Sequence, residues 1–535
     1  MSFRFSTFKR AVCVPHLFWL FCLAVAGNLH GAGVTLVTHG LNSDVTGWII
    51  PMADKMPQSP HFQGTNFTCY EMRFITNAQG KVVIAQTKLG GVNPTNSDSG
   101  EIFIKLNWSQ FSDGYSSNTT QIATAVVPAL LQTNFIPELG GKPLVELPLH
   151  LVGHSRGGSL VCEITRLLGA QGVWVDQLTT LDPHPLNNDG FNDFFFSVVD
   201  ASALAYVNVL FADNYYQSIS SPIKGEAIAG AYNRRLTSLS GGYAQSTPVG
   251  YQHSNVHLWY HGTIDTNTPA SDNQASITTT ERQAWWAPSE NQGGVTGFYY
   301  TLIGGGNRLG TNEPAGAGTG QIRAGYNGVW NLGGGLGSRR SLPSNNGTWP
   351  NLLRLNILGT AQVHLGETNT FRVYWQSGQD SSNADLRLYL DTDANPYNAN
   401  QTQITQLSLP GTGTNAVSTI DVSAALNPVT TLPGTYSVYA RISDGLHTRY
   451  LYAPEPLILN PSLQPPRLTP LTATTNPFQL SISGFPGQKL IIQSSTNCLN
   501  WTSLITNTLA GTNGTFLDAA ASSYSRRFYR ALLSP

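Results

Sequence analysis

Charged residues are scarce in this sequence. Asp, Glu, Lys and Arg make up 11% of its 535 residues, whereas about 25% is usual for soluble proteins. The formal net charge is -1 at pH 7, and no run of basic residues occurs along the chain. Proteins that bind nucleic acids or anionic membranes through charge need clustered Lys and Arg. The composition therefore excludes nucleic acid as an expected partner and gives no indication of an anionic membrane surface.

Cysteine is scarce as well, and long apolar runs are absent after the N-terminal segment. Outside that segment the cysteines are Cys69, Cys162 and Cys498. Three widely separated cysteines do not make a disulfide framework. We expect buried free thiols at Cys69 and Cys162, because both occur in apolar runs. A membrane-spanning helix needs about 20 apolar residues, so no transmembrane segment is predicted once the N-terminal segment is removed.

The first 26 residues have the pattern of an export signal. Arg4, Lys9 and Arg10 form a positive region, and a largely apolar stretch follows over residues 11–26. This stretch ends in Ala24-Val25-Ala26, a small-x-small cleavage site. The apolar stretch is short for a membrane anchor. We therefore predict a signal peptide over residues 1–26 and a secreted protein, extracellular or associated with the cell surface.

The chain is too long for one hydrophobic core. Over residues 27–340, strand patterns alternate with helix patterns, which predicts an α/β domain whose mostly parallel sheet carries helices on both faces. Residues 81–87 and 101–108 are expected to pair as a hairpin. The expected strands are 34–38, 67–74, 147–152, 173–181 and 205–212, and the expected helices are 45–56, 119–132 and 157–168.

The pattern changes after residue 350. Alternating apolar and polar runs separated by turn residues, without a helix pattern, predict an all-β sandwich over residues 350–460. The prolines of residues 460–466 mark a linker, and a small β module is expected over residues 467–535. The two modules resemble fibronectin type III or immunoglobulin-like domains and the C-terminal modules of secreted bacterial proteins. That resemblance implies possible contacts with glycans or a cell surface.

One short motif indicates a catalytic residue. Gly153-His154-Ser155-Arg156-Gly157 has the form G-x-S-x-G, with an apolar strand pattern before it and a helix pattern after it. A nucleophile at such a strand-to-helix turn is strained and crowded, so the positions two before and two after it must lack side chains. Ser155 is therefore predicted to be a nucleophile. An ordinary turn serine is the alternative.

A second motif fits an oxyanion-binding loop. His39-Gly40 follows the strand expected at residues 34–38, and glycine there allows the backbone to approach closely. We expect the backbone N–H groups of Leu41 and Arg156 to hold a developing oxyanion. His39 itself is expected to be a packed, hydrogen-bonded histidine.

The segments TLVTHGLN, LHLVGHSRGGSL and LTTLDPHP together resemble the α/β-hydrolase superfamily, and in particular its branch related to pancreatic lipases. The resemblance covers about residues 34–265. It implies that the acid of a Ser-His-Asp triad is Asp182, in the LDP turn. Asp213, at the end of the next strand, occupies the more usual position of the superfamily and remains the alternative.

The base is expected last in chain order. GYQHSNVHLWYHGTID offers His253, His257 and His261, and His253 matches the position that the resemblance implies, ahead of an aromatic pair. Three histidines at four-residue spacing also suggest a metal site, but the outer two would lie about 11 Å apart on a helix, too far for one tetrahedral ion. We therefore expect no metal and no other cofactor. Trp48 is expected to border the pocket.

These observations predict a secreted serine hydrolase that cleaves carboxylic esters or lipid-like substrates. A peptidase or a polysaccharide deacetylase with the same triad remains an alternative, as does a non-catalytic adhesion or glycan-binding protein. In the sandwich, Asp391, Asp393 and Asn395 stand at alternate positions, as in the start of a calcium loop. Pro396 replaces the turn glycine of such a loop, so a hairpin turn is favoured over calcium binding.

Overall fold

The computed structural model describes residues 32–59, 62, 64–219, 223–237, 251–264, 271–272, 275–286, 297–301, 339–344, 347, 349–378, 383–413, 417–471 and 477–534. The predicted signal peptide, residues 1–26, lies outside the described residues. Over the described part of the chain, no helix is both long and apolar enough to cross a membrane.

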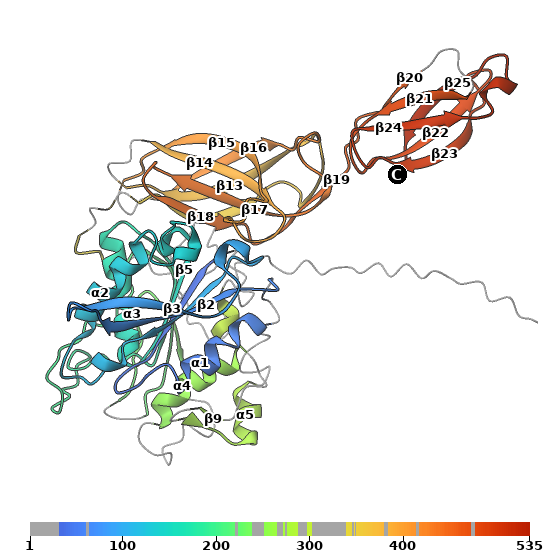
Figure 1. Ribbon diagram of the computed structural model, residues 1–535. Coiled ribbons are helices and arrows are strands. Elements are labelled where there is room, and N and C mark those ends of the chain that lie inside the picture. The colour runs from blue at the N-terminus through green and yellow to red at the C-terminus, as the bar shows by residue number, and fades with distance from the viewer. Residues whose placement is uncertain are drawn as a thin grey trace, which may run out of the picture.

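An eight-stranded sheet forms the centre of the N-terminal part (Figure 1). Its order is β3-β2-β4-β1-β5-β6-β7-β8, and all neighbours are parallel except β3 and β2. The prediction of a mostly parallel sheet is confirmed. The strands are β1 (Val34–Thr38), β2 (Thr68–Thr76), β3 (Val82–Gly91), β4 (Ile102–Asn107), β5 (Leu149–His154), β6 (Val175–Leu181), β7 (Val209–Tyr216) and β8 (Tyr232–Arg235).

The expected hairpin between residues 81–87 and 101–108 is wrong. β3 pairs with β2, whereas β4 lies between β2 and β1 and is parallel to both. The side chains explain this difference. Five of the six residues of β4 are buried, so it takes an interior position, while β3 is largely half-buried or exposed and forms an edge.

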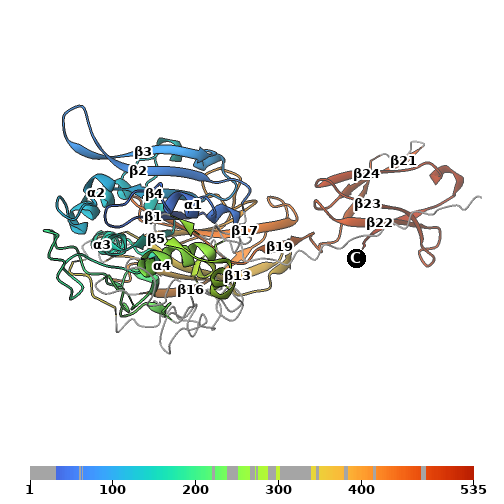
Figure 2. The same cartoon turned by 90° about the horizontal axis from the view of Figure 1, so that it is seen from below.

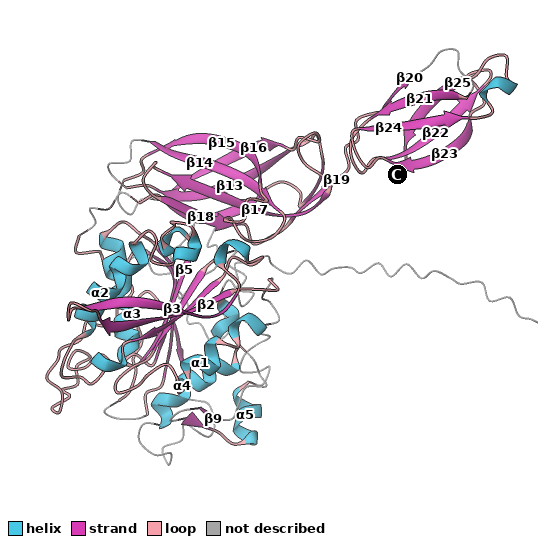
Figure 3. Ribbon diagram, viewed as in Figure 1, coloured by secondary structure: helices cyan, strands magenta, loops and turns pink. Residues whose placement is uncertain are grey.

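The helices contribute to two hydrophobic cores, and Figure 3 shows helices on both sides of the sheet. α2 (Thr119–Leu131) and α3 (Arg156–Ala170) pack into one core, and α1 (Ile49–Ala53), α4 (Tyr251–Gly262) and α5 (Thr279–Trp285) into the other. α1 is shorter than the helix expected over residues 45–56. Pro57 lies in a 3₁₀ turn that follows α1, and the residue before a proline is disfavoured in an α-helix.

Residues 351–460 form two β-sheets around one apolar core. One sheet has the order β11-β13-β16, and the other has the order β12-β19-β17-β14-β15, with β18 paired to β17. Trp375 is buried in this core and is not presented to a ligand. The strands are β11 (Asn351–Ile357), β12 (Gln362–His364), β13 (Thr368–Gln376), β14 (Asn383–Asp391), β15 (Thr402–Pro410), β16 (Ser418–Ala425), β17 (Gly434–Ser443), β18 (Thr448–Tyr452) and β19 (Leu457–Asn460).

A smaller β unit ends the chain and stands apart from the other two parts in Figures 1 and 2. Its sheets have the orders β20-β21-β24 and β23-β22-β25. The strands are β20 (Arg467–Pro470), β21 (Phe478–Ser483), β22 (Lys489–Ser495), β23 (Thr502–Thr508), β24 (Asn513–Asp518) and β25 (Phe528–Leu533). Trp501 is half-buried, and the guanidinium of Arg530 lies 4.2 Å from its ring centroid.

The sheets of residues 351–460 pack against the segments that precede the parallel strands. Ala32 N–H donates to Ala394 O at 3.0 Å just before β1, and Arg449 Nη2 donates to Trp174 O at 3.1 Å just before β6. The side-chain amide of Asn395 donates to Ser97 O at 2.6 Å ahead of β4. The contact therefore lies at the amino ends of the strands, away from their carboxyl ends.

The Asp391–Asn395 segment belongs to this contact. It begins the turn between β14 and β15, as predicted for a hairpin turn. Asp391 accepts a hydrogen bond from the Tyr452 hydroxyl at 2.5 Å, and Asp393 accepts from Asn398 and Asn400. The polar groups of this turn therefore hold the turn itself and its contact with the central sheet.

Candidate active site

Ser155 lies between β5 and α3 in a strained backbone conformation, with φ 58° and ψ -128°. Few residues other than glycine adopt a positive φ, and such strain is found mainly at functional sites. The flanking glycines are required by space. A Cβ on Gly153 would lie 2.1 Å from Gly157 O, and a Cβ on Gly157 would lie 2.4 Å from His39 O. The sharp turn predicted from the G-x-S-x-G motif is therefore present.

His253 and Asp182 meet beside this turn. His253, at the start of α4, has its Nδ1 2.6 Å from Oδ2 of Asp182, which directly follows β6. Asp182 is fully buried, and its carboxylate also accepts hydrogen bonds from the backbone and side-chain N–H groups of Gln217, both at 2.9 Å. A carboxylate held from several sides in this way orients the imidazole ring.

Asp213 has other partners. Its Oδ1 accepts a hydrogen bond from the Thr179 hydroxyl at 2.6 Å and from the Gln177 amide at 3.1 Å. The carboxylate lies within the sheet, on β7, and is 1% exposed. The structure thus brings Asp182, and not Asp213, to the candidate base.

The loop after β1, which was expected to hold an oxyanion, touches the turn at Ser155. A Cβ on Gly40 would lie 2.6 Å from the Cβ of Ser155, so only glycine fits at this distance. Leu41 and Arg156 both line the pocket. Arg156 is the first residue of α3, and the first N–H groups of a helix are free of intrahelical bonds and attract negative charge. The Arg156 side chain forms a buried ion pair with Asp200 at 2.7 Å.

His39 is a packed, hydrogen-bonded residue, as expected. Its Nε2 accepts a hydrogen bond from Trp108 N–H at 3.2 Å, and its ring stacks on the Trp108 ring at 5.3 Å. Burial lowers the pKa of His39 to about 4. His39 is therefore neutral at pH 7 and holds the loop after β1 against the residues after β4.

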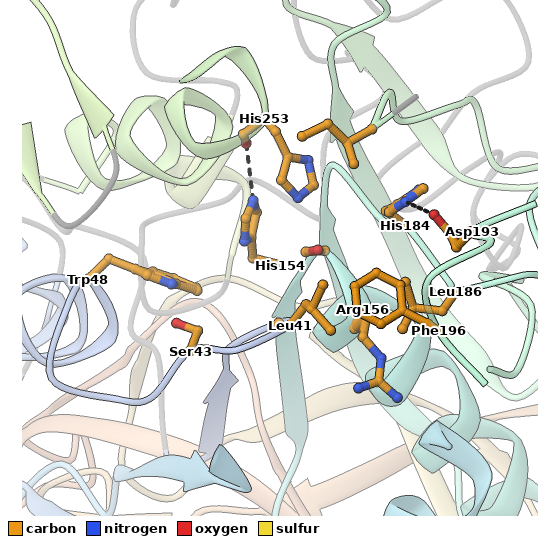
Figure 4. A pocket seen from close by; sticks show the side chains of 13 residues that line it. Leu41, Ser43, Trp48, His154, Arg156, His184, Leu186, Asp193, Phe196 and His253 are labelled. Carbon is orange, nitrogen blue, oxygen red and sulfur yellow. Dashed lines mark hydrogen bonds and ion pairs between the residues drawn. The ribbon is translucent and has the colours of Figure 1, made fainter. Parts of the chain in front are cut away.

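A pocket of about 170 Å³ opens over these residues (Figure 4). Its polar lining residues are Ser43, His154, Ser155, Arg156, His184, Asp193 and His253. Its apolar walls are Leu41, Trp48, Leu186, Phe196 and Ile223. Trp48 was expected at the border of the pocket, and the structure places it there. The pocket therefore combines polar groups around Ser155 with apolar walls.

His184 was missed by the sequence analysis, although it lies two residues after Asp182. Its backbone N–H donates to Ser155 O at 3.2 Å, and its Nδ1 lies 2.5 Å from Asp189 Oδ2. Burial by itself lowers the pKa of His184, but the carboxylates of Asp189 and Asp193 outweigh burial and raise it. His184 thus connects the turn at Ser155 to the loop that follows His184.

This loop, residues 186–200, is closed by hydrogen bonds and presents aromatic side chains outward. Leu186 and Asp200 exchange hydrogen bonds of 3.0 Å at its two ends. Phe196 turns into the pocket, whereas Phe194 and Phe195 are 83% and 84% exposed. The run of phenylalanines in the sequence was a signal for this feature, but its position beside the pocket was not evident from the chain.

The remaining histidines of α4, His257 and His261, are both buried. His257 stacks on Trp48 at 4.6 Å between ring centroids, and His261 is buried. Over the described residues, no group of three or more His, Cys, Asp or Glu side chains is arranged to hold a metal ion.

Comparisons with known proteins do not assign this chain to a family. No family model matches it, and no curated protein matches it. Among solved structures, the CARDB domain of the PF1109 protein from Pyrococcus furiosus, in complex with di-metal ions, is 12% identical, covers 22% of this chain and 94% of its own, and has a TM-score of 0.14. The Pseudomonas fluorescens alkylpurine DNA glycosylase AlkC is 17% identical, with 20% of this chain and 31% of its own covered and a TM-score of 0.14. Likenesses this weak carry no information on fold or function.

Proposed function

We propose that this protein is a secreted serine hydrolase of the α/β-hydrolase type that cleaves carboxylic esters. One observation carries the proposal: Ser155, at a strained strand-to-helix turn, shares a pocket with His253, whose Nδ1 lies 2.6 Å from Oδ2 of Asp182. A serine hydroxyl becomes a nucleophile when a histidine accepts its proton and a carboxylate orients that histidine. The parallel sheet, with the site at its carboxyl edge, agrees with this proposal.

The reaction follows from the positions of these groups. His253 Nε2 accepts the Ser155 proton while Oγ attacks the ester carbonyl. The backbone N–H groups of Leu41 and Arg156 hold the oxyanion. Asp182 stabilises the imidazolium, which then gives its proton to the leaving alcohol. Water, activated by the same histidine, hydrolyses the acyl-enzyme and frees Ser155.

The lining of the pocket supports an ester with an apolar acyl group. Leu41, Trp48 and Leu186 offer an apolar wall next to the nucleophile, and burial of each methylene contributes about 0.8 kcal/mol. The exposed rings of Phe194 and Phe195 adjoin this wall through Phe196. We therefore favour lipid-like, poorly soluble esters. The resemblance to the pancreatic-lipase branch agrees with this choice.

A fluorophosphonate probe tests the proposal, because it phosphonylates only an activated serine. We expect labelling of the mature protein that is lost in both Ser155→Ala and His253→Ala. A series of p-nitrophenyl esters of increasing chain length, with an acetylated glycan and a casein-type peptide substrate beside it, then defines the acyl substrate. A folded wild-type protein that is neither labelled nor active on any ester would refute the proposal and favour a binding protein.

A further inference from the structure

His154, the residue before the nucleophile, contacts the backbone of the candidate base. It is the last residue of β5 and is 6% exposed. Its Nε2 lies 3.1 Å from the backbone carbonyl oxygen of His253, as the dashed line in Figure 4 shows. A carbonyl oxygen only accepts hydrogen bonds, so Nε2 carries the proton and donates it. The bond joins two segments that are 99 residues apart in the chain.

The surroundings of His154 keep its ring neutral. Burial, together with the neighbouring His253 and His257, lowers the pKa of His154 well below its usual value. The His154 ring centroid lies 4.5 Å from that of His253 and 4.7 Å from that of His257, and the edge of Trp48 covers another side. A neutral ring in this place adds no positive charge next to His253 when His253 takes up a proton.

Two contacts therefore define the position of His253 from opposite ends of the residue. Asp182 orients the imidazole through Nδ1, and His154 fixes the main chain through the carbonyl oxygen. Because His154 is covalently joined to Ser155, any shift of the nucleophile turn is transmitted directly to the base. Rate depends steeply on such alignment, and a displacement of about 1 Å lowers it about 100-fold.

We propose that His154 is a positioning residue that sets the place of His253 relative to Ser155 through its Nε2–H bond to the His253 carbonyl. The catalytic consequence rests on the function proposed above, whereas the positioning itself does not. His154 takes no part in bond making. Its contribution is the fixed geometry between nucleophile and base.

Three variants separate the hydrogen bond from simple packing. His154→Phe keeps a ring but removes the donor, and His154→Gln keeps an N–H donor of similar reach. His150→Phe is the matched control, because His150 lies on the same strand, is 7% exposed and bonds to Thr179 outside the pocket. Thermal unfolding of each variant shows whether it is folded before activity is compared.

We expect His154→Phe to lower kcat on dissolved p-nitrophenyl butyrate at least tenfold, with KM changed less than twofold. The rate of fluorophosphonate labelling should fall by a similar factor. His154→Gln should recover most of both rates, and His150→Phe should stay within about twofold of the wild type. Unchanged rates in His154→Phe, an equal loss in His154→Gln, or an equal loss in His150→Phe would each overturn the inference.

A spectroscopic measurement tests the positioning even if the protein proves inactive. The Nδ1–H proton of His253, bonded to Asp182, should give a downfield proton NMR signal that is assigned by its loss in Asp182→Ala. We expect this signal to shift or broaden in His154→Phe and to persist in His154→Gln and His150→Phe. If the wild-type protein is inactive but the signal changes in His154→Phe, the proposed function is refuted and the positioning role stands. If the signal is unchanged in His154→Phe, the positioning role is refuted.

Discussion

Glu101 allows the packing at the amino ends of the strands to be tested through pH. This residue directly precedes β4 and is 2% exposed, close to the contact with the sheets of residues 351–460. Its Oε1 accepts a hydrogen bond from the Thr35 hydroxyl at 3.0 Å. Burial, to which the charge of Asp176 adds, raises the pKa of Glu101 from 4.5 to about 8. The folded protein therefore holds this carboxyl group protonated at pH 7.

The sign of the effect follows from proton binding. A carboxyl group whose pKa is higher in the folded state binds its proton more tightly there, so the free energy of unfolding falls as pH rises from about 4.5 to about 8 and then levels off. At about 1.4 kcal/mol per pH unit, the whole loss is on the order of 5 kcal/mol. Glu101→Gln replaces the acid by an amide that does not ionise, and should remove this loss.

The assay is denaturant unfolding of the wild type and Glu101→Gln from pH 4.5 to pH 9 at constant ionic strength. We expect similar stability at pH 4.5 and a growing advantage of the variant up to about pH 8. Glu455→Gln, at an exposed position, is the control and should track the wild type throughout. A difference between the wild type and Glu101→Gln that does not change with pH would refute the reasoning.

Two further predictions concern the candidate site. Asp182→Asn should lower kcat for ester hydrolysis by about 10⁴-fold, because the base loses its orienting carboxylate. Asp213→Asn should mainly lower the melting temperature measured by thermal unfolding. The reverse pattern would assign the acid of the triad to Asp213. The double change Phe194→Ser and Phe195→Ser should lower turnover of emulsified tributyrin about 100-fold, since each buried Phe ring contributes about 1.5 kcal/mol or more, while turnover of dissolved p-nitrophenyl acetate stays unchanged. The control is Leu446→Ser, which alters a side chain that is 88% exposed on the β17–β18 turn. An equal loss of turnover on both substrates in the double variant would contradict a role of the loop of residues 186–200 in binding emulsified substrate.

Several local features were predictable because their causes lie within a few residues. The strand over residues 34–38 matches β1, and the helix over residues 119–132 matches α2 closely. The turn at Ser155 was predictable for a similar reason. Gly153 and Gly157 are needed because their Cβ atoms would collide within the turn or with the adjacent His39, and this need is visible in the motif itself.

Strand pairing was less predictable. The alternating pattern of residues 82–91 indicates a strand but does not name its partner. A hairpin with residues 101–108 was expected, but Ile102, Phe103 and Ile104 are buried in the structure. A central position between β1 and β2 buries these side chains. The packing of the sheets of residues 351–460 against the central sheet was likewise not evident, because Arg449 and Trp174 are 275 residues apart in the chain.

By itself, the sequence determined that Ser155 stands at a strained turn, that a parallel sheet precedes β units, and that a few acids and histidines are candidates for partners. The tertiary structure alone decided that Asp182 meets His253 while Asp213 bonds to Thr179, and that His154 reaches the His253 carbonyl. The physical reason is the separation along the chain between the residues that interact. Steric limits on a turn act between neighbouring residues and leave a motif, whereas hydrogen bonds between distant segments depend on the path of the whole chain.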